Sequence, residues 1–566
     1  MSEKNRISNM ENLYNLLNDS QLSDTQKSLI EEIKLREQEK ILEPENAALL
    51  IKLIKNAENN DEAQAIAALG TTYKRTGFHF DKRLEKHVMS DTIKYFEKNK
   101  NLSFGEAKEG EPIHKLIIGD NYDALNNLLI QYRKKVDVIY IDPPYAKDSL
   151  GNFAQENYTN AISRDNLLSM LYFRLQIAKQ LLSDDGVIFC SIDDRNHSYV
   201  KCLFDEIFGE SCFLLNVPRQ TKKGGKTTTT IAKNNDYIIG YTLSRDIIFS
   251  QEEIEDLSKY KYEDEFVEER GKYALTQTLD YNSLGYSTNM DFPIEFDGRT
   301  FIPGGDENAY HERLKGFHGV KDWTWRWGKD AVKWAKENSL LELKGNRIYT
   351  KSYLKCRKKN GKCELEFFDE KGKAFTTLSY IENEYSNDNA NKELARIFLN
   401  SSQIFRNPKG TVLVKKLIEM VCNKKDAIIL DFFAGSGTTG HAVLELNKDG
   451  GKRTFLLCQI NEATDTTPNG IAYDVTSKRM KRVMTGECYD GNSDFKWIKE
   501  NKPYGGKLDV YEIREVSNNC AIRGKTPFDV IDETLYGLEK FKSTREKIEW
   551  VCQNFSHTQM VEPKED

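Results

Sequence analysis

Four residues that follow one apolar stretch carry the most specific chemistry in this sequence. The stretch "VDVIYI", residues 136–141, runs directly into Asp142, Pro143, Pro144 and Tyr145. A buried strand does not tolerate a carboxylate and two prolines, so the chain must reach the surface here. The sequence therefore predicts hydrogen-bond acceptors and an aromatic ring at the end of a strand.

These residues suit the methylation of an exocyclic amine on a heteroaromatic ring. If Asp142 and the carbonyl of Pro143 accept the two N–H hydrogens, the nitrogen becomes tetrahedral and its lone pair can attack a sulfonium methyl group. The prolines hold the turn rigid, so the acceptors are pre-organised for the positive charge that develops on nitrogen. Tyr145 would stack on the ring, and neither a metal nor a cysteine nucleophile is required.

A second motif, "AIILDFFAGSGTTGHAV", has Gly435, Gly437 and Gly440 in G-x-G-x-x-G spacing between an apolar strand and a helix. Glycines there allow a tight turn, and N–H groups at a helix N-terminus attract the anionic end of a nucleoside cofactor. Gln459 and Glu462 follow about 20 residues later, where ribose hydroxyls are bound. By itself this motif suits a dinucleotide enzyme equally well.

Alternating strands and helices surround both motifs and must position them. We expect strands at 115–118, 136–141 and 187–192, a helix at 121–132, and a turn at Asp185 and Gly186. From about residue 251 to 400 this alternation of strands and helices is replaced by short polar segments, and the alternation resumes before the glycine motif. The sequence predicts one parallel sheet built from two separated stretches, with an inserted domain between them.

Bulk properties exclude several classes of protein. A chain of 566 residues exceeds a single core, and its composition, 39% hydrophobic and 30% charged, is typical of a soluble protein. No apolar run suits a membrane helix or a signal peptide, so we expect a cytoplasmic protein. The ten cysteines form no C-x-x-C pair, and the net charge of −6 argues weakly against nucleic acid unless a local basic patch exists.

Together the motifs resemble S-adenosylmethionine-dependent amino methyltransferases of DNA, with "DPPY" as the catalytic motif and "DFFAGSGTT" as the cofactor loop. The catalytic motif comes first, by about 290 residues, which is similar to the permuted β-class order. Through "LIIGDNYDAL", "FDEIFGESCF" and "FRNPKG" the resemblance narrows to the modification subunits of type III restriction-modification systems. It covers roughly residues 110–250 and 390–490.

The resemblance implies an α/β fold: a Rossmann-like class I methyltransferase sheet, circularly permuted, with an inserted α+β target-recognition domain and a helical N-terminal region. Five domains are implied. Residues 1–105 would be a helical region for dimerisation or partner docking, residues 106–250 the catalytic half and residues 251–395 the target-recognition domain. Residues 396–500 would be the cofactor-binding half and residues 501–566 a C-terminal region.

The resemblance also assigns roles to single residues. Asp142, Pro143, Pro144 and Tyr145 would form the methyl-transfer site. The residues implied for S-adenosylmethionine are Asp120, Phe405, Pro408, Lys409, Asp431, Phe433, Ala434, Gly435, Ser436, Gly437, Thr438, Gln459 and Glu462. Asp120 could equally cap the helix that begins at residue 121. Many relatives carry an acid in place of Gln459, and Glu462 could take over that contact.

Two basic segments are candidates for DNA contacts, "PRQTKKGGKTTTTIAK" and "KSYLKCRKKNGK". Their candidate residues are Arg219, Lys222, Lys223, Lys226, Arg357, Lys358 and Lys359. Either segment could instead be an ordinary solvated charge run. The tryptophan cluster at residues 323–327 could stack on bases or pack in a core, and packing is favoured because it is the commoner role of aromatic residues.

The leading hypothesis is a site-specific adenine-N6 methyltransferase that acts on a flipped adenine in double-stranded DNA. By resemblance it would be a homodimer, joined by a separate restriction subunit with translocase and nuclease activity. Asp before Pro-Pro-Tyr, rather than Ser, favours adenine over cytosine N4, which stays open as the second hypothesis. The motifs are also compatible with a stand-alone adenine methyltransferase, an RNA or protein amine methyltransferase, and a catalytically idle DNA-recognition subunit.

Overall fold

The computed structural model describes residues 22–38, 42, 44–69, 80, 92–145, 164–224, 231–244, 249–253, 257–319, 321–359, 361–368, 372–398, 404–517 and 525–555. By the density of its internal contacts the chain divides into two compact units, Met1–Asp81 and Lys82–Asp566. None of the helices in these described ranges has the length and apolar character needed to span a membrane.

Within the described residues of the first unit, three helices pack on one another, α2 (Asp24–Gln38), α3 (Pro44–Lys55) and α4 (Asn60–Leu69). A capping box formed by Ser23 and Gln26 begins α2. The backbone N–H of Gln26 donates to Ser23 Oγ at 3.1 Å, and the backbone N–H of Ser23 donates to Gln26 Oε1 at 3.0 Å. Two N–H groups that the helix itself leaves unpaired are thereby satisfied.

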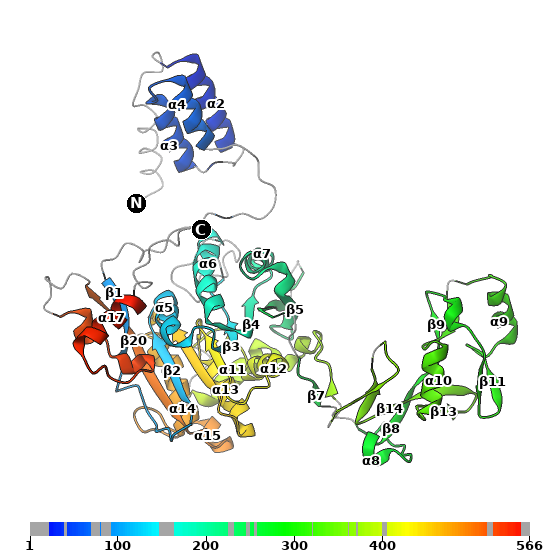
Figure 1. The fold of residues 1–566 in the computed structure, drawn as a ribbon. Coiled ribbons are helices and arrows are strands. Elements are labelled where there is room, and N and C mark those ends of the chain that lie inside the picture. Colours follow the sequence, from blue (N-terminus) through cyan, green and yellow to red (C-terminus); the bar gives the residue numbers. More distant parts are fainter. Residues whose placement is uncertain are drawn as a thin grey trace. The chain divides into compact units, whose positions relative to one another are not determined.

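The second unit is organised around one nine-stranded sheet (Figure 1). In spatial order its strands are β1 (Thr92–Lys98), β20 (Lys507–Ser517), β2 (Ile113–Ile118), β19 (Thr454–Gln459), β18 (Ile428–Asp431), β3 (Val136–Ile141), β4 (Leu182–Ile192), β6 (Asn235–Thr242) and β5 (Phe213–Gln220). The strands from β20 to β4 are parallel, whereas β1, β6 and β5 pair antiparallel with their neighbours.

The centre of the sheet joins the two separated stretches of chain. Strand β18, which precedes the glycine motif, pairs in parallel with β3, which precedes Asp142, in the register Ile429↔Val138 and Leu430↔Ile139. The predicted single sheet is therefore confirmed, and the fold is a Rossmann-like α/β sheet assembled from two separated stretches of the chain. Since parallel strands end on the same side, both motifs emerge at the same edge.

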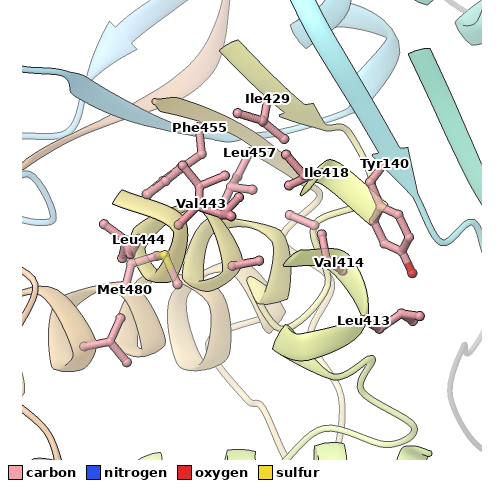
Figure 2. Packing of buried hydrophobic residues seen from close by; sticks show 14 of the residues in the cluster. Tyr140, Leu413, Val414, Ile418, Ile429, Val443, Leu444, Phe455, Leu457 and Met480 are labelled. Atoms are coloured by element: carbon pink, nitrogen blue, oxygen red, sulfur yellow. The ribbon is translucent and has the colours of Figure 1, made fainter. Parts of the chain in front are cut away.

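Helices cover the sheet on both faces (Figure 1). One layer contains α5 (Asn121–Tyr132), α6 (Arg164–Leu181) and α7 (His197–Phe208), and the other contains α11 (Asn387–Ile397), α12 (Thr411–Val421), α13 (Thr438–Leu446) and α14 (Lys478–Thr485). Val443 of α13 packs against Phe455 and Leu457 of β19 in the core of the second layer (Figure 2). The helix at 121–132 and the strand at 136–141 have the predicted bounds.

The region between the two halves has its own core and short elements. Its strands are β8 (Tyr273–Thr278), β9 (Asp280–Ser283), β10 (Ile294–Phe296), β11 (Arg299–Phe301), β12 (Asp322–Trp325), β13 (Leu341–Lys344), β14 (Arg347–Tyr353), β15 (Cys356–Lys358) and β16 (Leu365–Phe367), and its helices are α8 (Val267–Arg270), α9 (Glu307–Leu314) and α10 (Lys329–Glu337). Strands β7 (Glu252–Glu253) and β17 (Gly372–Lys373) pair at its two ends.

The expected boundary at residue 395 is wrong. Tyr380, Tyr385 and the buried residues of α11 belong to the core of the sheet, so the domain that contains the sheet resumes soon after β17. Two polar 3₁₀ turns, at Ser379–Ile381 and Asn383–Tyr385, hide this return from the sequence pattern.

Three other expectations also need correction. Residues 92–98 form an edge strand of the sheet and do not belong to the helical N-terminal region, and residues 507–517 complete the sheet from the C-terminal region. The C-terminal region also contributes α16 (Pro527–Val530) and α17 (Thr544–Asn554).

Asp185 and Gly186 lie within β4, where the register shifts, and form no turn. A Cβ at Gly186 would lie 3.0 Å from the carbonyl oxygen of Val136, so only glycine fits this approach.

The centre of the sheet buries one histidine between two strands. His114 of β2 stacks on Phe455 of β19 with ring centroids 4.1 Å apart, and its Nδ1 accepts the backbone N–H of Phe455 at 3.3 Å. Burial lowers the pKa of His114 to about 3. The fold therefore accepts only the neutral imidazole, since the charged form would be desolvated without a counter-charge.

We expect this histidine to make folding sensitive to acid. The unfolded chain binds its proton near pH 6.5 and the folded chain only near pH 3, so the stabilisation is complete above pH 6.5 and is lost as the pH falls below it. Between pH 7.5 and 5.5 the wild type should lose about 1.4 kcal/mol more unfolding free energy than His114→Gln. Urea unfolding followed by tryptophan fluorescence measures this, with the exposed His311→Gln as control, and an equal loss in wild type and His114→Gln would contradict it.

Candidate active site

Polar side chains gather where four neighbouring parallel strands end. Asp120 follows β2, Asp142 follows β3, and Asp431 and Gln459 are the last residues of β18 and β19. Such an edge, with helices beginning beside it, is where open α/β sheets bind their ligands. The structure thus brings together the residues that the sequence predicted from two distant motifs.

Asp142 is bonded through both of its carboxylate oxygens. Lys409 Nζ lies 2.6 Å from Oδ2, and the hydroxyl of Tyr145 donates to Oδ1 at 3.2 Å. Pro143 is buried and Pro144 half-buried, so the turn after β3 is fixed by packing as well as by ring closure. Burial, followed by the nearby Asp142, raises the pKa of Tyr145 well above its ordinary value, and its hydroxyl stays protonated.

The glycine loop has the geometry that its sequence predicts. Gly435 and Gly437 have φ angles of +50° and +80°, which residues with a side chain rarely adopt. A Cβ at Gly435 would lie 3.0 Å from the ring of Phe405, so the "FRNPKG" segment packs over the loop. At Gly440 a Cβ would lie 2.7 Å from Met480 Sδ, which shows that this third glycine permits close packing of α13.

Asp431 and Gln459 hold the glycine loop from within, and their predicted contact with a cofactor stays a prediction. Asp431 Oδ1 accepts the N–H of Phe433 at 2.9 Å and Oδ2 the hydroxyl of Thr439 at 2.5 Å, while burial raises the pKa of Asp431 to about 7. Gln459 Oε1 accepts the N–H of Gly435 at 2.7 Å. An amide oxygen can accept this bond without placing a charge in the interior.

Asp120 caps helix α5, as the capping hypothesis predicted. Its carboxylate accepts the N–H of Tyr122 at 2.8 Å and also bonds Arg174 Nη2 at 2.9 Å. The neighbouring Asn121 donates to the carbonyl of Phe432 at 2.7 Å, which ties the start of α5 to the glycine motif. About a third of the Asp120 side chain remains exposed at the sheet edge, so a ligand contact is compatible with the capping role.

The remaining predicted cofactor residues surround the loop. Phe433 is half-buried, and Ala434, Ser436, Thr438 and Pro408 are buried. The Thr438 hydroxyl donates to the backbone carbonyl of Lys409 at 3.0 Å, whereas the Lys409 ammonium is directed to Asp142. Glu462 lies beyond β19, where its carbonyl accepts the N–H of Ile471.

Arg479, which no sequence motif indicated, is a fully buried residue of α14 beneath the loop. Its Nη1 donates to Thr438 Oγ1 at 3.0 Å and to Ser436 Oγ at 3.2 Å, and its Nη2 donates to Glu393 Oε1 at 2.7 Å. Since Glu393 belongs to α11, this one guanidinium connects the loop to a helix that precedes it in sequence. The segment "TSKRMKRV" carries four cations in eight residues of surface-like pattern, so no sequence signal separates Arg479 from its neighbours.

Arg174, by contrast, had a signal in the sequence. It lies in α6 at helical spacing from Leu167, Leu171 and Ala178, all of which are buried. A cation on an apolar helix face is costly to bury without a partner, and Asp120 is that partner. The periodicity of the helix therefore pointed to a buried ion pair.

The predicted DNA-contact residues do not share one environment. Arg219 was wrongly predicted as a surface contact: it lies in β5, is completely buried, and bonds Asp236 through two nitrogens at 2.8 and 2.5 Å. Lys222 and Lys223 are exposed just beyond β5, and Lys226 lies outside the described residues. In the inserted region Arg357 pairs with Glu366 at 2.7 Å and Lys359 with Glu364 at 3.2 Å, while Lys358 lies over the ring of Trp327.

The tryptophan cluster belongs to the core of the inserted region, as the favoured interpretation predicted. Trp325 is buried and its indole N–H donates to the carbonyl of Phe292 at 2.6 Å. Trp327 packs against the same core, and the ring of Trp323 lies against Gly304. Trp325 and Trp327 therefore serve packing, whereas Trp323 is half-buried with Arg347 over its ring.

Comparisons with known proteins agree with this geometry. The profile of a DNA methylase family of N6 and N4 methyltransferases matches residues 136–466, and that of an uncharacterised conserved protein family matches residues 26–138. The chain is 30% identical to the Mod subunit of the type III restriction-modification enzyme StyLTI of Salmonella typhimurium, over 66% of this chain and 58% of that protein. It is 28% identical to the EcoPI Mod subunit of Escherichia phage P1, over 79% and 71%.

A relative of another type is matched over almost its whole length. The chain is 30% identical to the type II methyltransferase M.KpnI of Klebsiella pneumoniae, over 71% of this chain and 94% of that protein. The chain thus spans between about half and three quarters of the two Mod subunits but nearly all of the type II enzyme. With the family profile covering more than half of its residues, this chain belongs to the DNA methylase family and is similar to Mod subunits.

Proposed function

We propose that this protein is a site-specific adenine-N6 methyltransferase that uses S-adenosylmethionine and acts on an adenine flipped out of duplex DNA. The observation that carries the proposal is the meeting of Asp142 and Tyr145 with the glycine loop at one edge of the sheet, through the pairing of β3 with β18. Extraction of the base is required because an enzyme cannot reach an exocyclic amine inside the base stack.

The residues of the loop fit S-adenosylmethionine. Gly435 and Gly437 hold the loop in a left-handed turn, and the half-buried ring of Phe405 packs over Gly435. Asp120, partly exposed at the adjacent strand end, supplies a carboxylate. When bound there, S-adenosylmethionine supplies an electrophilic methyl group on sulfur.

The chemistry then depends on groups that this chain holds in place. One oxygen of Asp142 and the carbonyl of Pro143 would accept the two N–H hydrogens of the target amine and stabilise the charge that develops on its nitrogen. Tyr145 would stack on the base. Asp142 could accept an N–H from either adenine or cytosine, so the preference for adenine rests on the resemblance to Mod subunits, and cytosine N4 is the second candidate substrate.

The partners follow from the relatives. Double-stranded DNA is the proposed substrate, and the likeness to two Mod subunits supports a separate restriction subunit as a partner. The homodimer is proposed from the family resemblance of the sequence alone. The nearly complete match to a type II methyltransferase favours, as a second candidate, an enzyme that acts without such a subunit. The inserted region would then be the target-recognition domain in either case.

The first prediction identifies the reaction and its catalytic residue. With tritiated S-adenosylmethionine and duplex DNA, the wild type should label N6-methyladenine, identified after digestion to nucleosides. Asp142→Ala removes an acceptor that stabilises developing charge, so transfer should fall by at least about 100-fold. Cofactor affinity, measured by calorimetry, should stay within about threefold, which is below 1 kcal/mol.

Since Asp142→Ala removes the nearest of the carboxylates that pair with the Lys409 ammonium, the double variant Asp142→Ala/Lys409→Met controls for misfolding. It should be equally inactive. Label in cytosine would select the N4 reaction, label only in RNA or protein would contradict the proposal, and an active Asp142→Ala would show the catalytic assignment to be wrong.

The second prediction concerns the support of the cofactor loop. Arg479→Met removes charged hydrogen bonds to Ser436 and Thr438, each worth about 1.5–3 kcal/mol, so the dissociation constant for S-adenosylmethionine should rise at least about tenfold. Lys478→Met is the matched control, because Lys478 is adjacent but pairs with Asp474 at the surface. Unchanged cofactor affinity in a folded Arg479→Met protein would refute this support role.

The third prediction concerns the exposed cations beyond β5. If Lys222 and Lys223 neutralise phosphates, the double alanine variant should bind DNA more weakly, and the slope of log affinity against log salt should fall by about 2. Lys540→Ala/Lys542→Ala removes the same charge from exposed positions in the C-terminal region and should leave the slope unchanged. Equal slopes for both variants would assign Lys222 and Lys223 to the ordinary solvated surface.

A further inference from the structure

The carboxylate of Asp142 belongs to a larger buried network. Lys409 Nζ is 2.6 Å from Asp142 Oδ2 and 3.9 Å from Asp236 Oδ2, so one ammonium lies between two carboxylates. The side chains of Lys409 and Asp236 are both 6% exposed. An ammonium enclosed in this way has few other positions to occupy, because if it moved away from either carboxylate, that buried carboxylate would lose its counter-charge.

The second carboxylate is itself anchored. Asp236 of β6 receives two hydrogen bonds from Arg219 of β5, and Arg219 also donates to the carbonyl of Tyr385 at 2.8 Å and to Asn387 Oδ1 at 2.9 Å. Two cations and two carboxylates balance, so the network carries no net charge into the interior. Its far end is built into paired strands and the start of α11, which makes it a rigid support for Lys409.

Lys409 is also fixed through its main chain. The hydroxyl of Thr438, at the start of α13, donates to the carbonyl of Lys409, and the Lys409 ammonium reaches Asp142 from that point. The glycine loop and the catalytic carboxylate are thereby connected through a single residue. Its place in the "FRNPKG" segment predicted that Lys409 is a ligand of the cofactor, whereas its charged end binds Asp142.

The two oxygens of Asp142 are held with unequal strength. Oδ2 has a short, charge-assisted bond to an ammonium that cannot move away cheaply. Oδ1 has a longer bond of 3.2 Å from the neutral hydroxyl of Tyr145, which precedes residues outside the described structure. The hydroxyl also lies 3.4 Å from Lys409 Nζ, so it can leave Oδ1 without breaking the ion pair.

We propose that Lys409 is a positioning residue that holds Oδ2 of Asp142, so that Oδ1 alone, released by Tyr145, accepts the amine of the substrate. This inference rests on the proposed function and deepens it. Tyr145 would guard Oδ1 until a base enters and would then stack on that base, which couples the entry of the base to the exposure of its acceptor. Asp236 and Arg219 would act through Lys409 by keeping its ammonium in place.

The test compares methyl transfer with cofactor binding in full-length variants. For Lys409→Met we expect the single-turnover rate at saturating DNA and S-adenosylmethionine to fall by about 100-fold, because an unheld carboxylate is no longer pre-organised. Its dissociation constant for S-adenosylmethionine should remain within about threefold. Lys409→Arg keeps a cation beside Asp142 and should recover at least a tenfold part of the lost rate.

Two further variants separate positioning from general damage. Lys409→Met/Asp236→Asn removes one charge of each sign and restores the electrical balance of the network, yet it should remain as slow as Lys409→Met. Lys424→Met breaks an ion pair to Asp137, near the opposite end of β3, and should leave rate and affinity unchanged.

The outcomes are distinct. A rate restored in the charge-balanced double variant would overturn the inference, since charge imbalance and not positioning would then explain the defect. Weakened cofactor binding with a normal rate at saturation would also overturn the inference, because Lys409 would then be a cofactor ligand. An unchanged rate together with an unchanged dissociation constant would overturn it as well. Methyl transfer to DNA by the wild type tests the proposed function separately. If the wild type transfers no methyl group to DNA, both the proposed function and the role of Lys409 are refuted.

Discussion

The parallel pairing of β18 with β3 is the interaction on which the rest of the site depends. Strand β18 leads directly into the glycine loop, and its neighbour β3 ends one residue before Asp142. Because both strands run in the same direction, their loops emerge together, although about 290 residues separate them in sequence. Everything that the site can do chemically follows from this one register.

Buried charge is the second constraint, and the protein meets it by pairing. The Lys409, Asp236 and Arg219 network balances its charges, and Arg479 pairs with Glu393 beneath the glycine loop. Such groups are strongly destabilising if one partner is removed. The same pairings connect strands and helices from both halves of the chain, so the geometry of the site is built into the fold and does not depend on surface loops.

The inserted region shows how an α/β sheet can be interrupted without being disturbed. Its entry and exit pair as two short strands, and its own core, which includes Trp325 and Ile348, is separate from that of the sheet. The chain then returns through Tyr380 and Tyr385, whose rings belong to the core of the sheet. The inserted region can therefore change without altering the sheet that holds the candidate site.

Hydrophobic periodicity and glycine spacing are local properties, so the sequence by itself determined the strands, helices and motifs that depend on them. Examples are the helix at residues 121–132, the strand at residues 136–141 and the left-handed turn at Gly435 and Gly437. The permuted motif order of the sequence and its resemblance to a known family also predicted the fold. Only the tertiary structure decided what each charge faces. Arg219 has the sequence context of a surface cation yet is buried on Asp236, and Lys409 has that of a cofactor ligand yet binds Asp142. The physical reason is that an ion pair is made between segments distant in sequence, and no local pattern records its partner.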